Sequence, residues 1–406
     1  MPVMERLADL ERGMAHVQSA IRELGHRNHG LQEQLKAHAE EQGALCDFLS
    51  TVGLFTYADL QSHRHARRCH LLVKEVFQVQ ELSMQMALLT GWSSARHLMA
   101  ASREVGAGIR DALPELSAQL LPRIYLCGGR RDGNCLTTLE RFEPTAGCWE
   151  PLPPMPTARY GCAAGGANGC VYVFGGHGGG PLLATAERFN PGTGQWETLP
   201  PMRTVRSSCT VASVGGCLYI VGGFDGRQAL ATADRFDPSA CRWESLSSMP
   251  TARYDCTSAA LAGPQHIFVF GGHGGGSPLA TTERYSVATG QWATMAKMPT
   301  ARHSCAAAAG VGSLYVFGGF DGRRSLAVAE LLDASTGRWS SLANMPRCRY
   351  EFAAARVEGC LYVFGGHDGR QALDDSWCFN MASRQWEQLI AIPAARSGCA
   401  CAAVGS

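Results

Sequence analysis

A register of three residue types recurs six times along the chain and constrains its fold more than any other feature. Pairs of glycines end short apolar runs such as VYVFGG (171–176) and LYVFGG (314–319). A tryptophan follows the first glycine of each pair by 21 residues, and an arginine follows each tryptophan by 10. Successive units are 47 residues apart, except for one interval of 49. Six copies in a common register indicate a repeat architecture in which each unit packs against its neighbours.

Each unit contains four short β-type runs separated by turn residues. In the second unit these runs are VYVFGG, ATAERFN, GQWETL and SSCTVAS. Four strands in about 40–50 residues are typical of one blade of a β-propeller. The double glycine, the ERF triplet and the spaced tryptophan resemble the kelch repeat over residues 124–406. Blades five and six depart from the pattern, because Glu330-Leu331-Leu332 and Trp377-Cys378-Phe379 replace the triplet.

These features predict an all-β, six-bladed kelch propeller over residues 123–406, preceded by an α-helical N-terminal region. The propeller opens with a run of the second-strand type (IYLCGG) and ends with one of the first-strand type (SGCACAAV). The C-terminal run is therefore expected to complete the first blade. Small residues after each arginine suit an innermost strand. The cysteines that recur among them are interpreted as small buried side chains: Cys162, Cys209, Cys256, Cys305 and Cys399.

The loops on one face of the predicted propeller carry the candidate binding residues. In an antiparallel meander, the loops between the second and third strands share a face with the corners that lead into the next blade. The corners hold six arginines: Arg159, Arg206, Arg253, Arg302, Arg349 and Arg396. Aromatic residues follow four of them: Tyr160, Tyr254, His303 and Tyr350. The loops add further candidates: His177, His273, His367, Arg227, Arg323 and Arg370, besides Arg130, Arg131 and Arg324.

Arginine-rich loops predict an anionic ligand, because the guanidinium fork matches a carboxylate. The kelch resemblance implies that the corner arginines line the recognition mouth, so the expected partner is an acidic peptide or protein surface. The alternative is that the arginines hold the corners by binding loop carbonyls or aspartates.

The sequence predicts no metal, no cofactor and no catalysis. His177 and His273 stand beside glycines, yet they belong to non-adjacent blades and no carboxylate accompanies them. Glu351 and Asp255 are the best candidates for a general base. The alternative is an enzyme, since some kelch propellers resemble oxidases or sugar mutarotases.

The N-terminal residues are expected to be helical. Residues 1–45 are predicted to form a coiled-coil-like helix, because apolar residues from Val3 to Leu45 recur at alternating steps of four and three. Asn28 at an inner position favours a parallel homodimer through residues 3–45, and packing on the same chain is the alternative. Residues 46–122 are predicted to form a helical region and linker. Its first run resembles an F-box, although the usual opening Leu-Pro is absent.

Charge and composition narrow the class of function. With 36 basic and 35 acidic residues, no global field favours nucleic acid or an anionic membrane. No signal-type segment and no run of 18 apolar residues is present, which predicts an intracellular protein of the cytoplasm or the nucleus. The chain is therefore interpreted as a non-catalytic protein–protein interaction module. A ubiquitin-ligase substrate receptor is one specific form of this hypothesis, and a cytoskeletal or scaffold protein is the alternative.

Overall fold

The computed structural model describes residues 122–261 and 265–405. The chain divides into two units, Met1–Leu120 and Leu121–Ser406. The predictions for residues 1–45 and 46–121, including the homodimer and the F-box-like run, lie outside the described residues.

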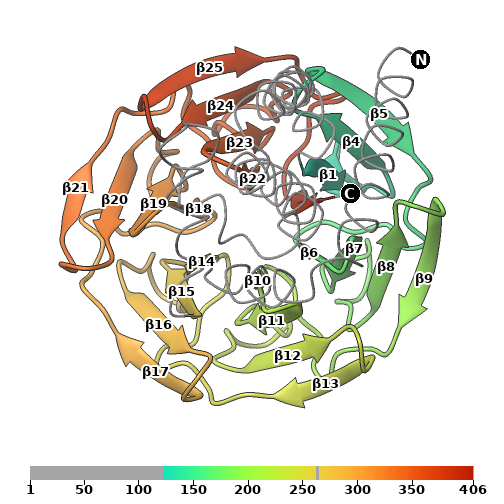
Figure 1. Ribbon diagram of the computed structural model, residues 1–406, viewed down its shortest axis with the longest axis horizontal. Helices are drawn as coiled ribbons and strands as arrows, with labels where there is room; N and C mark the ends of the chain where they lie inside the picture. The colour runs from blue at the N-terminus through green and yellow to red at the C-terminus, as the bar shows by residue number, and fades with distance from the viewer. Residues whose placement is uncertain (1–121, 262–264, 406) are drawn as a thin grey trace, which may run out of the picture. The chain divides into compact units, whose positions relative to one another are not determined.

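The second unit consists of six four-stranded antiparallel sheets around one axis, as Figure 1 shows. From the axis outward, blade 1 is β26-β1-β4-β5, blade 2 is β6-β7-β8-β9, and blades 3 to 6 follow in the same way up to β25.

The innermost strands are β26 (Ala400–Val404), β6 (Ala163–Ala167), β10 (Thr210–Val214), β14 (Thr257–Leu261), β18 (Ala306–Ala309) and β22 (Ala353–Val357). The second strands are β1 (Arg123–Cys127), β7 (Cys170–Phe174), β11 (Cys217–Val221), β15 (His266–Phe270), β19 (Ser313–Phe317) and β23 (Cys360–Phe364). The third strands are β4 (Leu139–Glu143), β8 (Ala186–Asn190), β12 (Ala233–Asp237), β16 (Thr282–Ser286), β20 (Ala329–Asp333) and β24 (Ser376–Asn380). The outer strands are β5 (Cys148–Leu152), β9 (Gln195–Leu199), β13 (Arg242–Ser245), β17 (Gln291–Thr294), β21 (Trp339–Ser341) and β25 (Gln385–Leu389).

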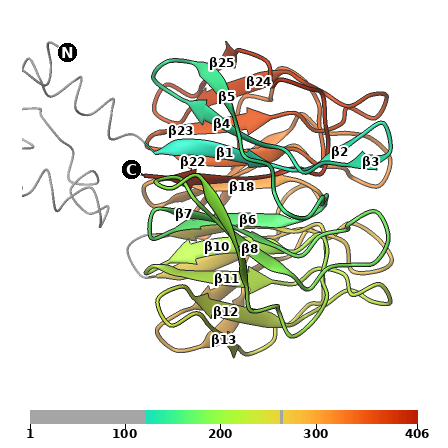
Figure 2. The ribbon, with the colours of Figure 1, turned by 90° about the vertical axis from the view of Figure 1, so that its right-hand side faces the viewer.

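The C-terminal strand closes the ring, as predicted. β26 pairs with β1 from Arg123↔Val404 to Cys127↔Ala400. Blade 1 is thus built from both ends of the propeller sequence. A short hairpin of β2 (Arg130–Arg131) and β3 (Asn134–Cys135) extends its loop at one end of the propeller (Figure 2).

Burial explains the composition of the four strand types. The inner strands are rich in alanine and glycine because six of them converge on the axis. The second strands have apolar side chains on both sides and are almost wholly buried, since a neighbouring blade covers each face. The outer strands are largely exposed. The recurrent cysteines, each one residue before an inner strand, are buried, as predicted, and burial raises the pKa of Cys162 to about 12.

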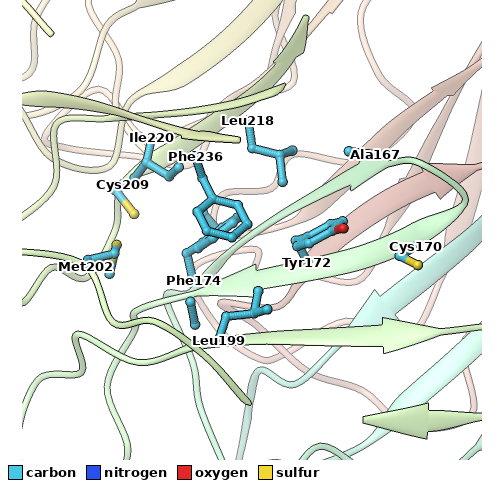
Figure 3. Close-up of a cluster of buried hydrophobic side chains, with 12 residues drawn as sticks. Ala167, Cys170, Tyr172, Phe174, Leu199, Met202, Cys209, Leu218, Ile220 and Phe236 are labelled. Carbon is cyan, nitrogen blue, oxygen red and sulfur yellow. The ribbon is translucent and has the colours of Figure 1, made fainter. Parts of the chain in front are cut away.

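Six apolar clusters fill the seams between blades. Figure 3 shows the cluster in which Tyr172 and Phe174 of blade 2 pack with Leu218 and Phe236 of blade 3. The recurrent tryptophan seals this seam: Trp243 contacts Phe174 edge-on at 5.6 Å, and its indole N–H donates to the Pro200 carbonyl at 2.8 Å. The core of this seam is therefore built from residues of two neighbouring blades.

Steric crowding around the glycine pairs, as well as their backbone conformation, excludes larger residues. Gly175 has φ 59°, and a Cβ there would lie 2.2 Å from the carbonyl oxygen of Arg206 in the next corner. Gly194, in a hairpin at the other end of the same blade, has φ 69° but nothing within 4 Å of a Cβ.

Gly175→Ala is expected to destabilise the propeller more than Gly194→Ala. The left-handed backbone costs either alanine about 1–2 kcal/mol, whereas crowding at Gly175 adds about 1–3 kcal/mol. Urea unfolding of the two variants measures the difference. Equal losses would show that the corner can move away from the added methyl group.

A closed ring of backbone hydrogen bonds surrounds the axis where the corners meet. One residue per blade takes part, each with a left-handed backbone, and its amide donates to the carbonyl of the preceding blade's residue at 2.7–3.1 Å. The six members are Gly161, Ser208, Asp255, Ser304, Glu351 and Gly398. The ring links all six blades without using side chains.

No helix in the described part of the chain is long and apolar enough to span a membrane.

Candidate partner-binding site

The corners and the loops between second and third strands meet at one end of the propeller, here called the loop face. In each blade a corner residue and a loop residue form an antiparallel bridge. The pairs are Tyr160–His177, Ser207–Phe224, Tyr254–His273, His303–Phe320, Tyr350–His367 and Ser397–Arg130. The structure thus brings together the loops that the sequence placed on a common face.

The six corner arginines are buried, with exposed fractions of 0–1%. Each guanidinium forms an ion pair of 2.6–2.9 Å with a carboxylate of the third-strand region in the next blade along the chain. The pairs are Arg159–Glu187, Arg206–Asp234, Arg253–Glu283, Arg302–Glu330, Arg349–Asp375 and Arg396–Glu140. The expectation that these side chains line an exposed recognition surface is therefore wrong.

Each corner arginine also ties the corner to the glycine pair. Arg253, for example, donates from Nη1 to the Gly271 carbonyl at 2.8 Å. The carboxylate and the carbonyl both stabilise the buried cation, and the planar fork can reach the two acceptors at once, which explains why all six blades use arginine. The alternative reading of the sequence, in which the arginines hold the corners, fits this geometry.

The acidic partners of the corner arginines can be recognised in the sequence by their position in the repeat. An acidic residue stands 12 positions after the first glycine in five of the six units. In blade 6, Trp377 occupies that position and the carboxylate comes from Asp375, two residues earlier. Residues two apart in an extended chain point to the same side, so the ion pair survives the shift.

An arc of seven aromatic rings lines the loop face over blades 3 to 6. Successive ring centroids are 5.2–5.6 Å apart. In order, the rings of this aromatic arc are Phe224, Tyr254, His273, His303, Phe320, Tyr350 and His367. Sequence reasoning missed Phe224 and Phe320, although each stands at the position that histidine occupies in other blades.

The loop histidines are fixed by their own loops. The backbone amides of Gly179, Gly275 and Gly369 each donate to the Nδ1 of the histidine two residues earlier, at 2.9–3.1 Å. In a neutral ring the proton then lies on Nε2. The described residues contain no group of three or more His, Cys, Asp or Glu side chains that could hold a metal.

The remaining predicted arginines are exposed on the loop face. Arg227, Arg323 and Arg370 occupy equivalent positions in DGR turns of blades 3, 5 and 6. The aspartate of each turn is engaged by the turn itself: amides of Gln228 and Arg227 donate to Asp225, and these hydrogen bonds lower its pKa. None of the three arginines forms an ion pair within residues 122–261 and 265–405, so their charge faces outward.

A cavity of about 450 Å³ opens on the loop face between blades 6, 1 and 2. Arg130 of blade 1, Tyr160 and His177 of blade 2, and His367 of blade 6 line it, together with Ser397. This blade-1 pocket adjoins the end of the aromatic arc at His367.

Two carboxylates lie close to the axis and differ in surroundings. Burial raises the pKa of Asp255, whose Oδ2 is 3.8 Å from Nδ1 of His303. Glu351 accepts a hydrogen bond of 3.0 Å from the Ser397 hydroxyl. The Asp255 carboxylate interacts with the Ser208 and Ser304 side chains, whereas that of Glu351 interacts with Ser397 and Arg130.

Comparison with known sequences identifies the fold. A family model described as the KLHDC2/KLHL20/DRC7 Kelch-repeats domain matches residues 117–298, 199–343 and 284–406. The chain belongs to the kelch-repeat family. Kelch propellers of this family are typically protein-binding and mostly non-catalytic.

Solved structures share the fold of the propeller. A chain described as the structure of YjhT is 16% identical and aligns with a TM-score of 0.57, covering 66% of this chain and 98% of its own. At that identity the likeness concerns the fold alone. A search of curated proteins finds no match to this kelch protein.

Proposed function

We propose that this kelch propeller is a non-catalytic protein-binding module whose loop face binds an acidic segment of a partner. The observation that carries the proposal is the outward charge of Arg227, Arg323 and Arg370. Because the arginines of the corners are paired inside the propeller, these turn arginines supply positive charge that is exposed on the loop face.

Exposed arginines are most numerous over three consecutive blades, where Arg131 and Arg324 each also lie 3.5 Å from the carboxylate of a neighbouring aspartate. Arg323 and Arg324 of blade 5, Arg370 of blade 6 and Arg131 of blade 1 are all exposed. Blades 2 and 4 carry HGGG loops without arginine. An acidic segment would therefore lie over blades 5, 6 and 1, beside the aromatic arc, whose tyrosines and histidines offer apolar contact and hydrogen bonds.

The same binding module fits two cellular roles. A substrate receptor of a ubiquitin ligase would use the loop face to hold its substrate, and a cytoskeletal or scaffold protein would use it to hold an assembly partner. In both roles the chain acts by binding, and residues 1–121 would supply the second contact.

Charge reversal tests the proposal. We expect a random-peptide library selected on the full chain to be enriched in aspartate and glutamate, and Arg323→Glu/Arg324→Glu/Arg370→Glu to abolish that enrichment. The matched control, Arg242→Glu/Arg338→Glu/Arg384→Glu, makes the same change of charge on exposed arginines at the opposite end of the blades. Selection of the same acidic peptides by both variants would refute an acidic-partner site on the loop face.

A further inference from the structure

The six-fold pattern of the loop face is broken in blade 1. The residue after the glycine pair is histidine or phenylalanine in five blades but Arg130 in blade 1. Its bridge partner, Ser397, stands where four other blades have an aromatic corner residue. The blade-1 pocket opens at this break. The departure from the repeat thus coincides with the cavity.

The Arg130 guanidinium lies over the Tyr160 ring with its donors unused. Its backbone forms two hydrogen bonds with Ser397, of 2.7 and 3.2 Å, and its guanidinium carbon lies 5.1 Å from the centre of the Tyr160 ring. The nearest carboxylate oxygen, on Glu351, is 4.0 Å away, beyond hydrogen-bond distance. Within the described part of the chain the guanidinium donates no hydrogen bond. All of its N–H donors are therefore available to a ligand.

The other walls of the pocket supply weaker donors. His177 and His367 both line the cavity and accept loop amides at Nδ1, which leaves an N–H at Nε2 of each neutral ring. Asp132 also lines the cavity, and Glu351 stands near Arg130. These two acids limit the negative charge that the site tolerates, so a singly charged group suits it better than a doubly charged one.

We propose that the blade-1 pocket is a subsite for one carboxylate side chain, an aspartate or glutamate of the bound segment, which Arg130 holds through its guanidinium fork. This inference rests on the proposed function and deepens it. In this proposal the arginines of the loop face have two roles. The exposed turn arginines attract an acidic segment, and Arg130 binds one of its residues.

Fluorescence anisotropy with a labelled oligoglutamate peptide tests the subsite on the full chain. Charge-assisted hydrogen bonds contribute about 1.5–3 kcal/mol, so Arg130→Ala is expected to raise the Kd by about 10-fold or more. Arg131→Ala is the matched control, because Arg131 is the next residue, is exposed and does not line the pocket. We expect it to raise the Kd less than about 5-fold, and less still in high salt. Thermal unfolding of both variants should be unchanged, since both side chains are exposed.

Different outcomes of the experiment would contradict different parts of the proposal. If Arg130→Ala binds oligoglutamate like the wild type while reversal of Arg323, Arg324 and Arg370 abolishes binding, the subsite is wrong and the loop-face function stands. If an oligophosphoserine peptide depends more strongly on Arg130 than oligoglutamate does, the site is a phosphate site and the carboxylate assignment fails. Equal loss in Arg130→Ala and Arg131→Ala at high salt would also overturn it, because the pocket would then add nothing to exposed charge.

Discussion

Replacing Arg253 with alanine is expected to lower the free energy of unfolding by about 3–5 kcal/mol, because it leaves the carboxylate of Glu283 buried without its cation. Glu283 is 1% exposed, and its Oε1 lies 2.9 Å from Nη2 of Arg253. The substitution also removes the hydrogen bond to the Gly271 carbonyl. Equilibrium urea unfolding measures the loss.

Two further variants distinguish the effect of breaking the buried ion pair from the effect of removing any positive charge. Arg227→Ala removes an exposed arginine from the same face and should change stability by less than about 0.5 kcal/mol. Arg253→Met/Glu283→Leu removes both charges and should be more stable than Arg253→Ala, since apolar pairs often replace a buried ion pair without loss. If Arg253→Ala unfolds at the same urea concentration as Arg227→Ala, the corner arginines do not support the fold.

Truncation after Gly398 is expected to abolish the folded propeller. The deletion removes β26, leaves β1 without its inner partner and opens the ring between blades 6 and 2. It also removes Ala400, Ala402 and Val404 from the seam with blade 2. The stability of an ordinary domain is about 5–15 kcal/mol, and loss of one of the four strands in a blade, with its seam, is of that order.

Circular dichroism and thermal unfolding check this expectation. Truncation after Val404 is the control, because it keeps the whole of β26. A synthetic peptide of the C-terminal strand, added to the shorter chain, should restore folding by pairing with β1. A cooperative transition at the wild-type temperature in the shorter chain without peptide would contradict closure by β26.

The repeat register made the fold of the propeller predictable in detail. Every blade carries its own glycine pair and tryptophan, so the number of blades and the order of strands follow from positions along the chain. Closure followed from the type of the first and last runs, and the pairing of β1 with β26 confirms it.

The candidate site was less predictable, because its properties depend on contacts between units. Arg159 looks like a surface residue until Glu187, 28 residues later, is placed against it. The aromatic arc likewise joins rings of successive blades, such as Phe224 and Tyr254, and their contact depends on how neighbouring blades pack. The importance of Arg130 emerges only when its departure from the repeat is seen to coincide with a cavity. The binding roles of Arg227, Arg323 and Arg370 stay predictions.

The closed ring of backbone hydrogen bonds at the axis also constrains how such a chain can change in evolution. Each of its six members both donates to one neighbour and accepts from the other. A seventh unit would have to break one of these bonds and bend the remaining ones to a wider circle, whereas overwriting one unit with a copy of another leaves the circle intact. The near-identical HGGG loops of blades 2 and 4 fit the second route. New specificity would then arise by exchange of loops on a fixed count of blades.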